Sequence, residues 1–283
     1  MKLIKSKFEI WEQEPGLEGI YKQIEKTAKI CYKSESNITE DSAKPFIDNV
    51  LLKRGHYSPL EHGTVYLYCK VIDNNPLEDY FHNPYSKAVW IGRGGYVDVY
   101  VATNFRVLVE HNRLEDLQYL CEPTEYHERR VCVHFVCDRG ILAEFTRHRV
   151  FSFSAESTRF CNYSKDKFGN EITFIKPCFL DDSKLALYGP YHTVIRDKSP
   201  ESIFIANLNN AERDYLDLIG LGWKPQEARA VLPNALKTEL VMTGFVSQWE
   251  DFFELRCAPN VHPQARELAI PLKEEFIKRE FIH

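Results

Sequence analysis

The spacing of apolar residues predicts amphipathic helices in several parts of the chain. Between Leu17 and Cys31, the side chains of Ile20, Ile24 and Ala28 recur every three or four residues, so they form one face of a helix. Similar repeats, most of them bounded by glycine or proline, predict further helices over residues 42–54, 113–120, 203–219 and 225–229 and from Pro263 onward.

Two more helices are indicated by the residues at their starts. Asp138 is a favourable N-cap for a helix through Phe145 that delivers Arg147 near its end. The run SQWE over residues 247–250 has the form of a capping box and predicts a helix that reaches about Arg256. Both helices are therefore expected to end close to an arginine.

Strict alternation of apolar and other residues predicts strands. Val65, Leu67, Cys69 and Val71 would share one face of a strand over residues 64–71. Further strands are expected over 131–137, 172–175 and 238–245, and residues 96–109 are expected to begin as a strand and end as a helix. The glycines at 92–95 fit a hairpin turn better than a phosphate-binding loop. Because the helices are segregated and do not alternate regularly with strands, the pattern predicts an α+β protein with a mixed sheet and flanking helices.

Composition narrows the class of protein. The 283 residues suffice for one large domain or two small ones, and the apolar (44%) and charged (27%) fractions are those of a globular protein. A net charge of −5 does not favour nucleic acid or an anionic membrane. We find no apolar run of the roughly 18 residues that span a bilayer and no secretory signal pattern, so we expect a cytoplasmic protein.

The eight cysteines show no disulfide or metal-site spacing. The stretch CVHFVC over residues 132–137 alternates like a strand, and no second ligand pair follows at the distance of a zinc site. We therefore expect free thiols and no metal.

The segment RHRVFSFSAESTRF, residues 147–160, concentrates positive charge and hydroxyl groups in an acidic chain. Arginine binds phosphate through paired, charge-assisted hydrogen bonds, and hydroxyl groups add neutral donors. A nucleotide-phosphate site could therefore use Arg147, Arg149, Ser157, Thr158 and Arg159, with His148 as a further donor. The alternative is a solvated basic turn. The interleaved Val150, Phe151 and Phe153 favour the site, because they tie the segment to the core.

The same segment closely resembles the signature of flavin-dependent thymidylate synthases, R-H-R-x-x-S followed by S-x-R. Three other stretches resemble segments of that family in the same order: GHYSPLEH at 55–62, ARAVLPNALKTELVMTG at 228–244 and FFELR at 252–256. Together they cover most of the chain and imply a single domain over residues 1–283 with the family's own fold. Residues from about 72 to 130 would be a long insertion.

The resemblance implies a function and its cofactors. Members of this family convert dUMP to dTMP with FAD, reduced by NADPH, and with methylenetetrahydrofolate as carbon donor. They form homotetramers whose active sites are shared between subunits.

The resemblance also implies roles for individual residues. Arg147, His148 and Arg149 would bind FAD, as would Thr64, which follows Glu61 and His62. Contacts with dUMP are implied for Glu144, Arg147, Ser157, Thr158, Arg159, Arg229 and Arg256. Arg256 would be catalytic, because an obligate cation against the uracil stabilises the negative charge that develops on the ring.

Several positions depart from the family's pattern. Ser154 and Ala155 replace a common Asn and a common acid, and Glu156 could take the place of that acid. Phe245, Ser247 and Asp251 stand where the family commonly has Asn, Arg and Asn in contact with FAD. The predicted dUMP half of the site is thus better preserved than the flavin half.

Alternatives remain at several levels. Arg229 and Arg256 could be ordinary helix-end arginines, and His62 could be structural rather than adjacent to flavin. The protein could instead transfer a hydroxymethyl or another one-carbon group to a pyrimidine nucleotide, or bind nucleotide without catalysis. A cysteine-dependent synthase needs a thiolate nucleophile. The stretch Pro177-Cys178-Phe179 lacks that enzyme's histidine, so we interpret Cys178 as a buried residue at a strand end.

Overall fold

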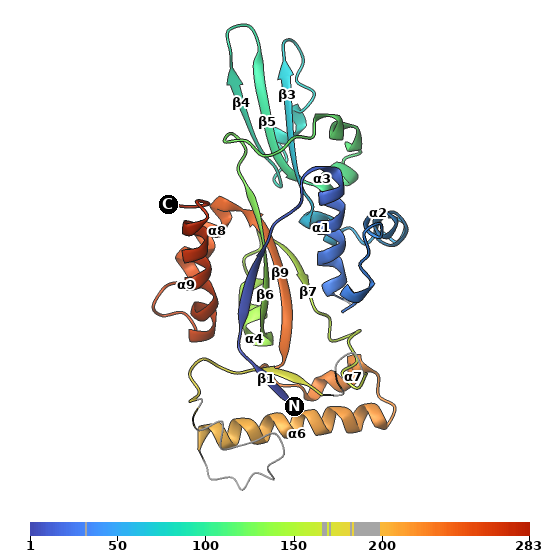
Figure 1. Ribbon diagram of the computed structural model, residues 1–283, viewed down its shortest axis with the longest axis vertical. Helices are drawn as coiled ribbons and strands as arrows, with labels where there is room; N and C mark the ends of the chain where they lie inside the picture. Colours follow the sequence, from blue (N-terminus) through green and yellow to red (C-terminus); the bar gives the residue numbers. More distant parts are fainter. Residues whose placement is uncertain (32, 166–168, 170, 182, 184–198) are drawn as a thin grey trace.

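The computed structural model of the chain describes residues 1–31, 33–165, 169, 171–181, 183 and 199–283. Its strands form a central, an upper and a lower sheet, which follow one another along the long axis of the molecule in Figure 1. The strand orders are β2-β6-β9-β7 in the central sheet, β3-β5-β4 in the upper sheet and β1-β8 in the lower sheet. The strand bounds are β1 Lys2–Ile4, β2 Lys7–Trp11, β3 Thr64–Val71, β4 Lys87–Gly92, β5 Val97–Asn104, β6 Arg130–Asp138, β7 Ser152–Ala155, β8 Thr173–Ile175 and β9 Lys237–Phe245.

The helices cover these sheets from several sides. The α-helices are α1 Gly16–Ile30, α2 Ala43–Phe46, α3 Phe105–Glu110, α4 Arg139–Phe145, α6 Pro200–Gly220, α7 Pro225–Ala228, α8 Val246–Arg256 and α9 Pro263–Lys278. A π-helical segment, Ile47–Leu52, continues α2, and short 3-10 turns include Ser58–His62, Leu114–Tyr119 and Arg229–Val231.

Alternation along β6 explains why the central sheet has helices on both faces. Val131, Val133 and Phe135 pack on one face with α4, α8 and α9 in a large buried cluster. On the other face, Cys132 packs with Trp11 and with α1. Figure 1 shows α8 and α9 on one side of this antiparallel sheet and α1 on the other. β6 is therefore apolar along most of its length.

The upper sheet is an antiparallel excursion between β3 and β6. β3 and β5 pair along their full lengths, from Thr64 opposite Asn104 to Val71 opposite Val97. The turn that joins β4 to β5 places Gly94 and Gly95 at positive φ, which confirms the predicted hairpin. The inner face of the sheet packs on α1, α3 and the π-helical segment.

The lower sheet pairs β1 with β8 in parallel and rests on α6. The α6 residues Leu208 and Tyr215 share a buried cluster with Phe174 of β8 and Ala228 of α7. This packing fixes α7 below the central sheet.

The structure confirms the α+β class, and every predicted helix and strand corresponds to an observed element within a few residues. The predicted helix over 42–54 is divided into α2 and the π-helical segment. The capping assignment at Ser247 was wrong: α8 begins one residue earlier, and Gln248 Oε1 accepts the backbone N–H of Phe245 at 2.8 Å. Ser247 instead binds Glu128. The single-domain assignment remains a prediction.

Two searches of the described residues give negative results. None of their helices is long and apolar enough to cross a membrane. The same part of the chain contains no group of three or more His, Cys, Asp or Glu side chains that could hold a metal ion.

Candidate functional site

Two helix ends meet at the predicted catalytic arginine. The Asp138 carboxylate caps α4 by accepting the backbone N–H of Ile141 at 2.8 Å, as its position predicted. α4 ends at Phe145, and the signature segment begins two residues later, at Arg147. Arg256 is the last residue of α8, and its side chain reaches the end of α4.

The guanidinium group of Arg256 is held on all three of its nitrogens. Nη1 contacts Glu144 Oε2 at 3.0 Å, and Nη2 donates to the Glu144 carbonyl at 2.6 Å. Nε donates to His148 Nε2 at 2.8 Å. The structure thus brings together three residues that lie up to 112 positions apart and that were predicted to bind dUMP or FAD.

The hydrogen bond from Arg256 fixes the form of His148. Burial and the Arg256 charge lower the pKa of His148 to about 4. At neutral pH the imidazole is neutral, so Nε2 accepts from Arg256 and Nδ1 carries the proton. Burial also lowers the pKa of Arg256, and nearby Arg147 acts in the same direction, whereas Glu144 opposes it. The guanidinium remains a cation held between an acid and a neutral imidazole.

Two other arginines of the signature are exposed to solvent. Arg147 and Arg149 are exposed, and no ion pair within the described part of the chain involves either one. Phe151 anchors the segment between them and β7, because its ring is 5% exposed and packs on Trp249 at 4.6 Å. The predicted tie to the core is confirmed for Phe151, whereas Val150 is 62% exposed and does not contribute to it.

A second group of predicted dUMP residues lies below the central sheet, beside α7. Arg229 Nη1 donates to Thr158 Oγ1 at 3.1 Å, and Arg159 Nε donates to Gln226 Oε1 at 3.2 Å. Ser157 belongs to the same turn, since its hydroxyl accepts the backbone N–H of Arg159 at 3.3 Å. No recorded hydrogen bond or ion pair between described residues joins this group to Arg256.

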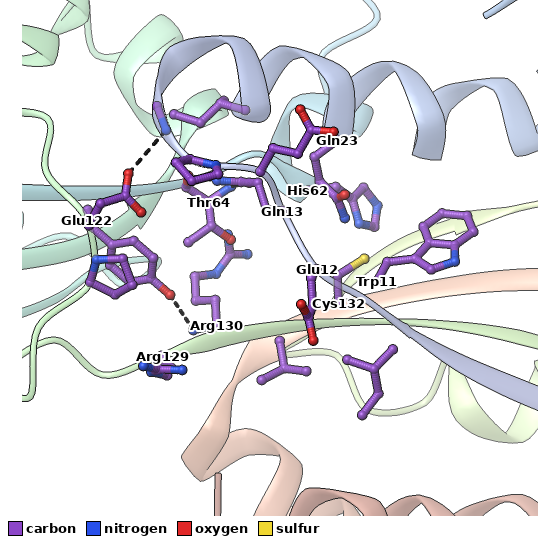
Figure 2. A pocket seen from close by; sticks show the side chains of 18 of the residues that line it. Trp11, Glu12, Gln13, Gln23, His62, Thr64, Glu122, Arg129, Arg130 and Cys132 are labelled. Carbon is purple, nitrogen blue, oxygen red and sulfur yellow. Dashed lines mark hydrogen bonds between the residues drawn. The ribbon is translucent and has the colours of Figure 1, made fainter. Parts of the chain in front are cut away.

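Thr64 lies apart from both groups. Its backbone N–H donates to Gln13 Oε1 at 2.8 Å, and its carbonyl accepts from Gln13 Nε2 at 2.9 Å. Its hydroxyl accepts from Arg130 Nη1 at 3.3 Å. Figure 2 shows it on the wall of a cavity of about 570 Å³ at the base of the upper sheet. None of the other residues predicted to bind dUMP or FAD lines this cavity.

Two of the positions that depart from the family's pattern, Phe245 and Ser247, have internal partners, and so does Glu156, beside a third. The Glu156 side chain is 1% exposed and binds Lys237 Nζ at 2.8 Å and the Tyr163 hydroxyl at 3.2 Å. A carboxylate held in this way does not replace the acid missing at Ala155. Ser247 donates to Glu128, and the Phe245 ring lies under the guanidinium of Arg130 at 5.5 Å.

Two residues with open interpretations are now placed. His62 is fully buried, its Nδ1 is 2.8 Å from Thr243 Oγ1, and burial lowers its pKa to about 3. These contacts favour a structural role. The prediction that Cys178 is buried was wrong, because the residue is exposed beyond the end of β8. Partial desolvation and the Glu267 carboxylate raise the pKa of its thiol to about 11, which does not suit a nucleophile.

Sequence reasoning missed two polar residues beside these groups. Gln226 contacts Arg159, and Arg130 contacts Thr64 and the Glu61 carbonyl. Arg130 had a detectable signal: it precedes an alternating strand on the same face as Cys132, where a charged residue is unusual.

Comparison with known proteins gives consistent matches. The family model described as thymidylate synthase complementing protein matches residues 127–279, more than half of the chain. A flavin-dependent thymidylate synthase of Pyrococcus furiosus is 27% identical over 146 residues, 52% of this chain and 53% of that protein. Its namesake in Pyrococcus abyssi is 22% identical over 212 residues, 72% and 79% of the two chains. The one in Mycolicibacterium gilvum is 31% identical over 138 residues, 47% and 51%. The chain thus spans about half the length of the first and third relatives.

Proposed function

Because the chain belongs to the thymidylate synthase complementing protein family, we propose that it is a flavin-dependent thymidylate synthase. It would convert dUMP to dTMP, with methylenetetrahydrofolate as carbon donor and FAD, reduced by NADPH, as hydride source. The cytoplasm is the proposed location, and neither nucleic acid nor a membrane enters the proposal.

The observation that carries this proposal is the arrangement around Arg256. A guanidinium that is mostly buried, next to exposed Arg147, offers a positive field at the point where a uracil ring would gain negative charge. Glu144 and His148 hold the guanidinium in one orientation, so little reorganisation is needed when the charge develops. Arg256 would stabilise the ionised ring, and His148 would position Arg256.

The second group supplies what a nucleotide monophosphate requires. Arg159 and Arg229 are exposed cations, and Ser157 and Thr158 add hydroxyl groups beside them. Charge-assisted hydrogen bonds to a phosphate are the strong ones, so these residues would dominate dUMP affinity.

The residues of the signature also fit FAD. The cofactor carries two phosphates, and Arg147 and Arg149 are unpaired within the described residues and exposed on a fixed turn. When bound, FAD supplies the hydride. The contacts of Ser247 and Phe245 with Glu128 and Arg130 make the beginning of α8 a weaker part of this binding surface.

We further propose a homotetramer with shared active sites and the family's own fold. Among the described residues, no hydrogen bond or ion pair is recorded between Arg256 with its partners Glu144 and His148 and the second group of predicted dUMP residues beside α7. A second subunit could bring one of these groups beside the other. Residues 72–130 would then be an insertion, since they lie almost wholly before the matched region 127–279.

The test is product analysis with purified protein, added FAD, dUMP, NADPH and methylenetetrahydrofolate. We expect dTMP and an absorbance band near 450 nm that is characteristic of bound flavin. Arg256→Ala should lower dTMP formation by about 10²–10³-fold while the protein remains folded. Arg213→Ala, an exposed arginine on α6, is the matched control and should be as active as the wild type.

Three outcomes would contradict the proposal in different ways. A hydroxymethylated nucleotide as product would indicate the related transferase, and nucleotide binding without product would indicate a binding protein. Near-normal dTMP formation by Arg256→Ala would remove the ring-stabilising role from this residue.

A further inference from the structure

The cavity at the base of the upper sheet has the size of a small-molecule site. Its volume is about 570 Å³, within the range of roughly 300–1,000 Å³ that is typical of ligand pockets. The end of β2, the beginning of α1, residues 120–123 and the beginning of β6 form its walls. Figure 2 shows polar side chains from these elements around it, among them Gln13, Gln23 and Arg130.

Two donors on this wall have no hydrogen-bond partner. Gln23 is 4% exposed, and its Nε2 is buried without a partner. The Nε of Arg130 is also buried and unpartnered. Native proteins rarely leave buried donors unsatisfied, and those that occur often mark a missing ligand or water. Two such donors on one cavity point to a common acceptor.

The charge of Arg130 is not neutralised by a direct partner. The hydrogen bonds of its guanidinium go to neutral oxygens, the nearest being the Glu61 carbonyl at 3.1 Å and Thr64 Oγ1 at 3.3 Å, and the Phe245 ring lies 5.5 Å from it. No ion pair within the described ranges involves Arg130. Burial lowers its pKa to about 10, so it is still a cation at neutral pH. An uncompensated buried cation is costly, and an anion in the cavity would offset that cost.

The acidic residues of the wall are engaged elsewhere. Glu12 binds Arg279 at 2.5 Å, Glu14 binds Lys22 at 3.1 Å, and Glu122 accepts the backbone N–H of Gly16 at 3.2 Å. They do not neutralise Arg130, but they oppose the entry of a highly charged anion. A single negative charge fits this balance better than a phosphate dianion.

Part of the remaining wall is apolar. Ile20 and Leu120 line the cavity together with Phe281. A ligand would therefore combine one anionic group with an apolar body.

We propose that this cavity binds a small organic carboxylate with an apolar body, whose carboxylate accepts from Gln23 and Arg130. The site is separate from the residues predicted to bind dUMP and FAD, of which only Thr64 reaches its wall. The upper sheet contributes to it, because Thr64 and Tyr66 of β3 line its wall and residues 120–123, which follow the sheet in the chain, close one side.

The probe for this site is 4-fluorobenzoate, and its binding to the full chain is followed by ¹⁹F NMR and calorimetry. We expect saturable binding to one site per chain, with inorganic phosphate at least tenfold weaker. Gln23→Leu replaces the unpartnered amide with an apolar group of similar size. It should weaken binding about tenfold or more with little loss of thermal stability, because the amide nitrogen gives up no hydrogen bond to nitrogen or oxygen and only its contact with the Cys132 thiol. Saturating dUMP and FAD should leave the affinity for 4-fluorobenzoate unchanged.

A second variant and a control keep the test decisive. Arg130→Lys retains the charge but removes Nε, and it should also weaken binding about tenfold, whereas Arg213→Met on α6 should bind like the wild type. Absence of 4-fluorobenzoate binding at millimolar concentration would overturn the proposal. So would wild-type affinity in both Gln23→Leu and Arg130→Lys, tighter binding of phosphate, or competition by FAD.

Discussion

The contact between Arg256 and His148 predicts how stability depends on pH. Burial and the Arg256 charge lower the pKa of His148 from 6.5 to about 4, so the folded protein takes up this proton less readily than the unfolded chain. The contribution of His148 to stability is therefore complete above about pH 6.5, falls as pH decreases below that value and is lost below about pH 4. We test this with His148→Gln, whose side-chain oxygen can still accept the N–H of Arg256 but does not titrate.

The magnitude follows from the two pKa values. Between pH 7 and pH 5, a shift from 6.5 to about 4 corresponds to a loss of about 2 kcal/mol in the free energy of unfolding. The imidazole is only half-buried, so solvent screening reduces the expected loss to about 1 kcal/mol. Fully buried His62, whose pKa is lowered to about 3, adds a loss of the same sign in both proteins. It cancels when the two are compared.

The assay is urea denaturation followed by tryptophan fluorescence at pH 7, 6 and 5. Wild type should lose about 1 kcal/mol more than His148→Gln between pH 7 and pH 5. Arg149→Gln, which changes an exposed neighbour, should follow the wild type. Parallel pH dependence in wild type and His148→Gln would refute the assignment of a neutral, accepting His148.

Three other substitutions test separate parts of the structure. Arg159→Ala should weaken dUMP binding by about tenfold or more, since bonds to charged groups contribute about 1.5–3 kcal/mol; unchanged affinity by calorimetry would remove it from the phosphate site. Gly244→Ala would place a Cβ 2.5 Å from the buried ring of Phe151 and should cost about 1–3 kcal/mol in urea denaturation; a wild-type midpoint would contradict this packing. Lys237→Met leaves the Glu156 carboxylate buried without its cation and should cost about 3–5 kcal/mol. A loss below about 1 kcal/mol would show that Glu156 is not held by this pair.

The elements that sequence patterns predicted are those that bury one face by themselves. The strand over 64–71 and the helix over 17–31 each place an apolar face in the core, so their periodicity was informative. β7 was missed because its four residues exist as a strand only through pairing with β9. β4 was missed because it is largely exposed at the edge of the upper sheet and shows no strong alternation.

The candidate site shows the same limit. The Asp138 cap of α4 and the ends of α4 and α8 could be predicted, because their signals lie in a few neighbouring residues, whereas the cap of α8 was assigned to the wrong residue. The contact between Arg256 and Glu144 could not, since it arises from the packing of two helices 112 residues apart in the chain. The cavity beside Gln23 was also beyond sequence reasoning, because its donors are identified only by the partners that they lack.

Glu144 and Glu156 show how location decides what an acidic residue near the signature does. Glu156 is 1% exposed, and its pairing with Lys237 confines it to the interior. The Glu144 side chain is 33% exposed and faces the guanidinium of Arg256, which is 16% exposed. An ion pair with this much solvent contact contributes about 0–1 kcal/mol to stability. A ligand could therefore displace the Glu144 carboxylate from Arg256 at little cost in free energy. A uracil ring that gains negative charge could then take the position of Glu144 on Arg256, whereas His148 would keep its hold on Nε. Glu144 would thus balance the charge of Arg256 before the substrate arrives, and Arg256 would stay ordered without a strong competitor for the ring.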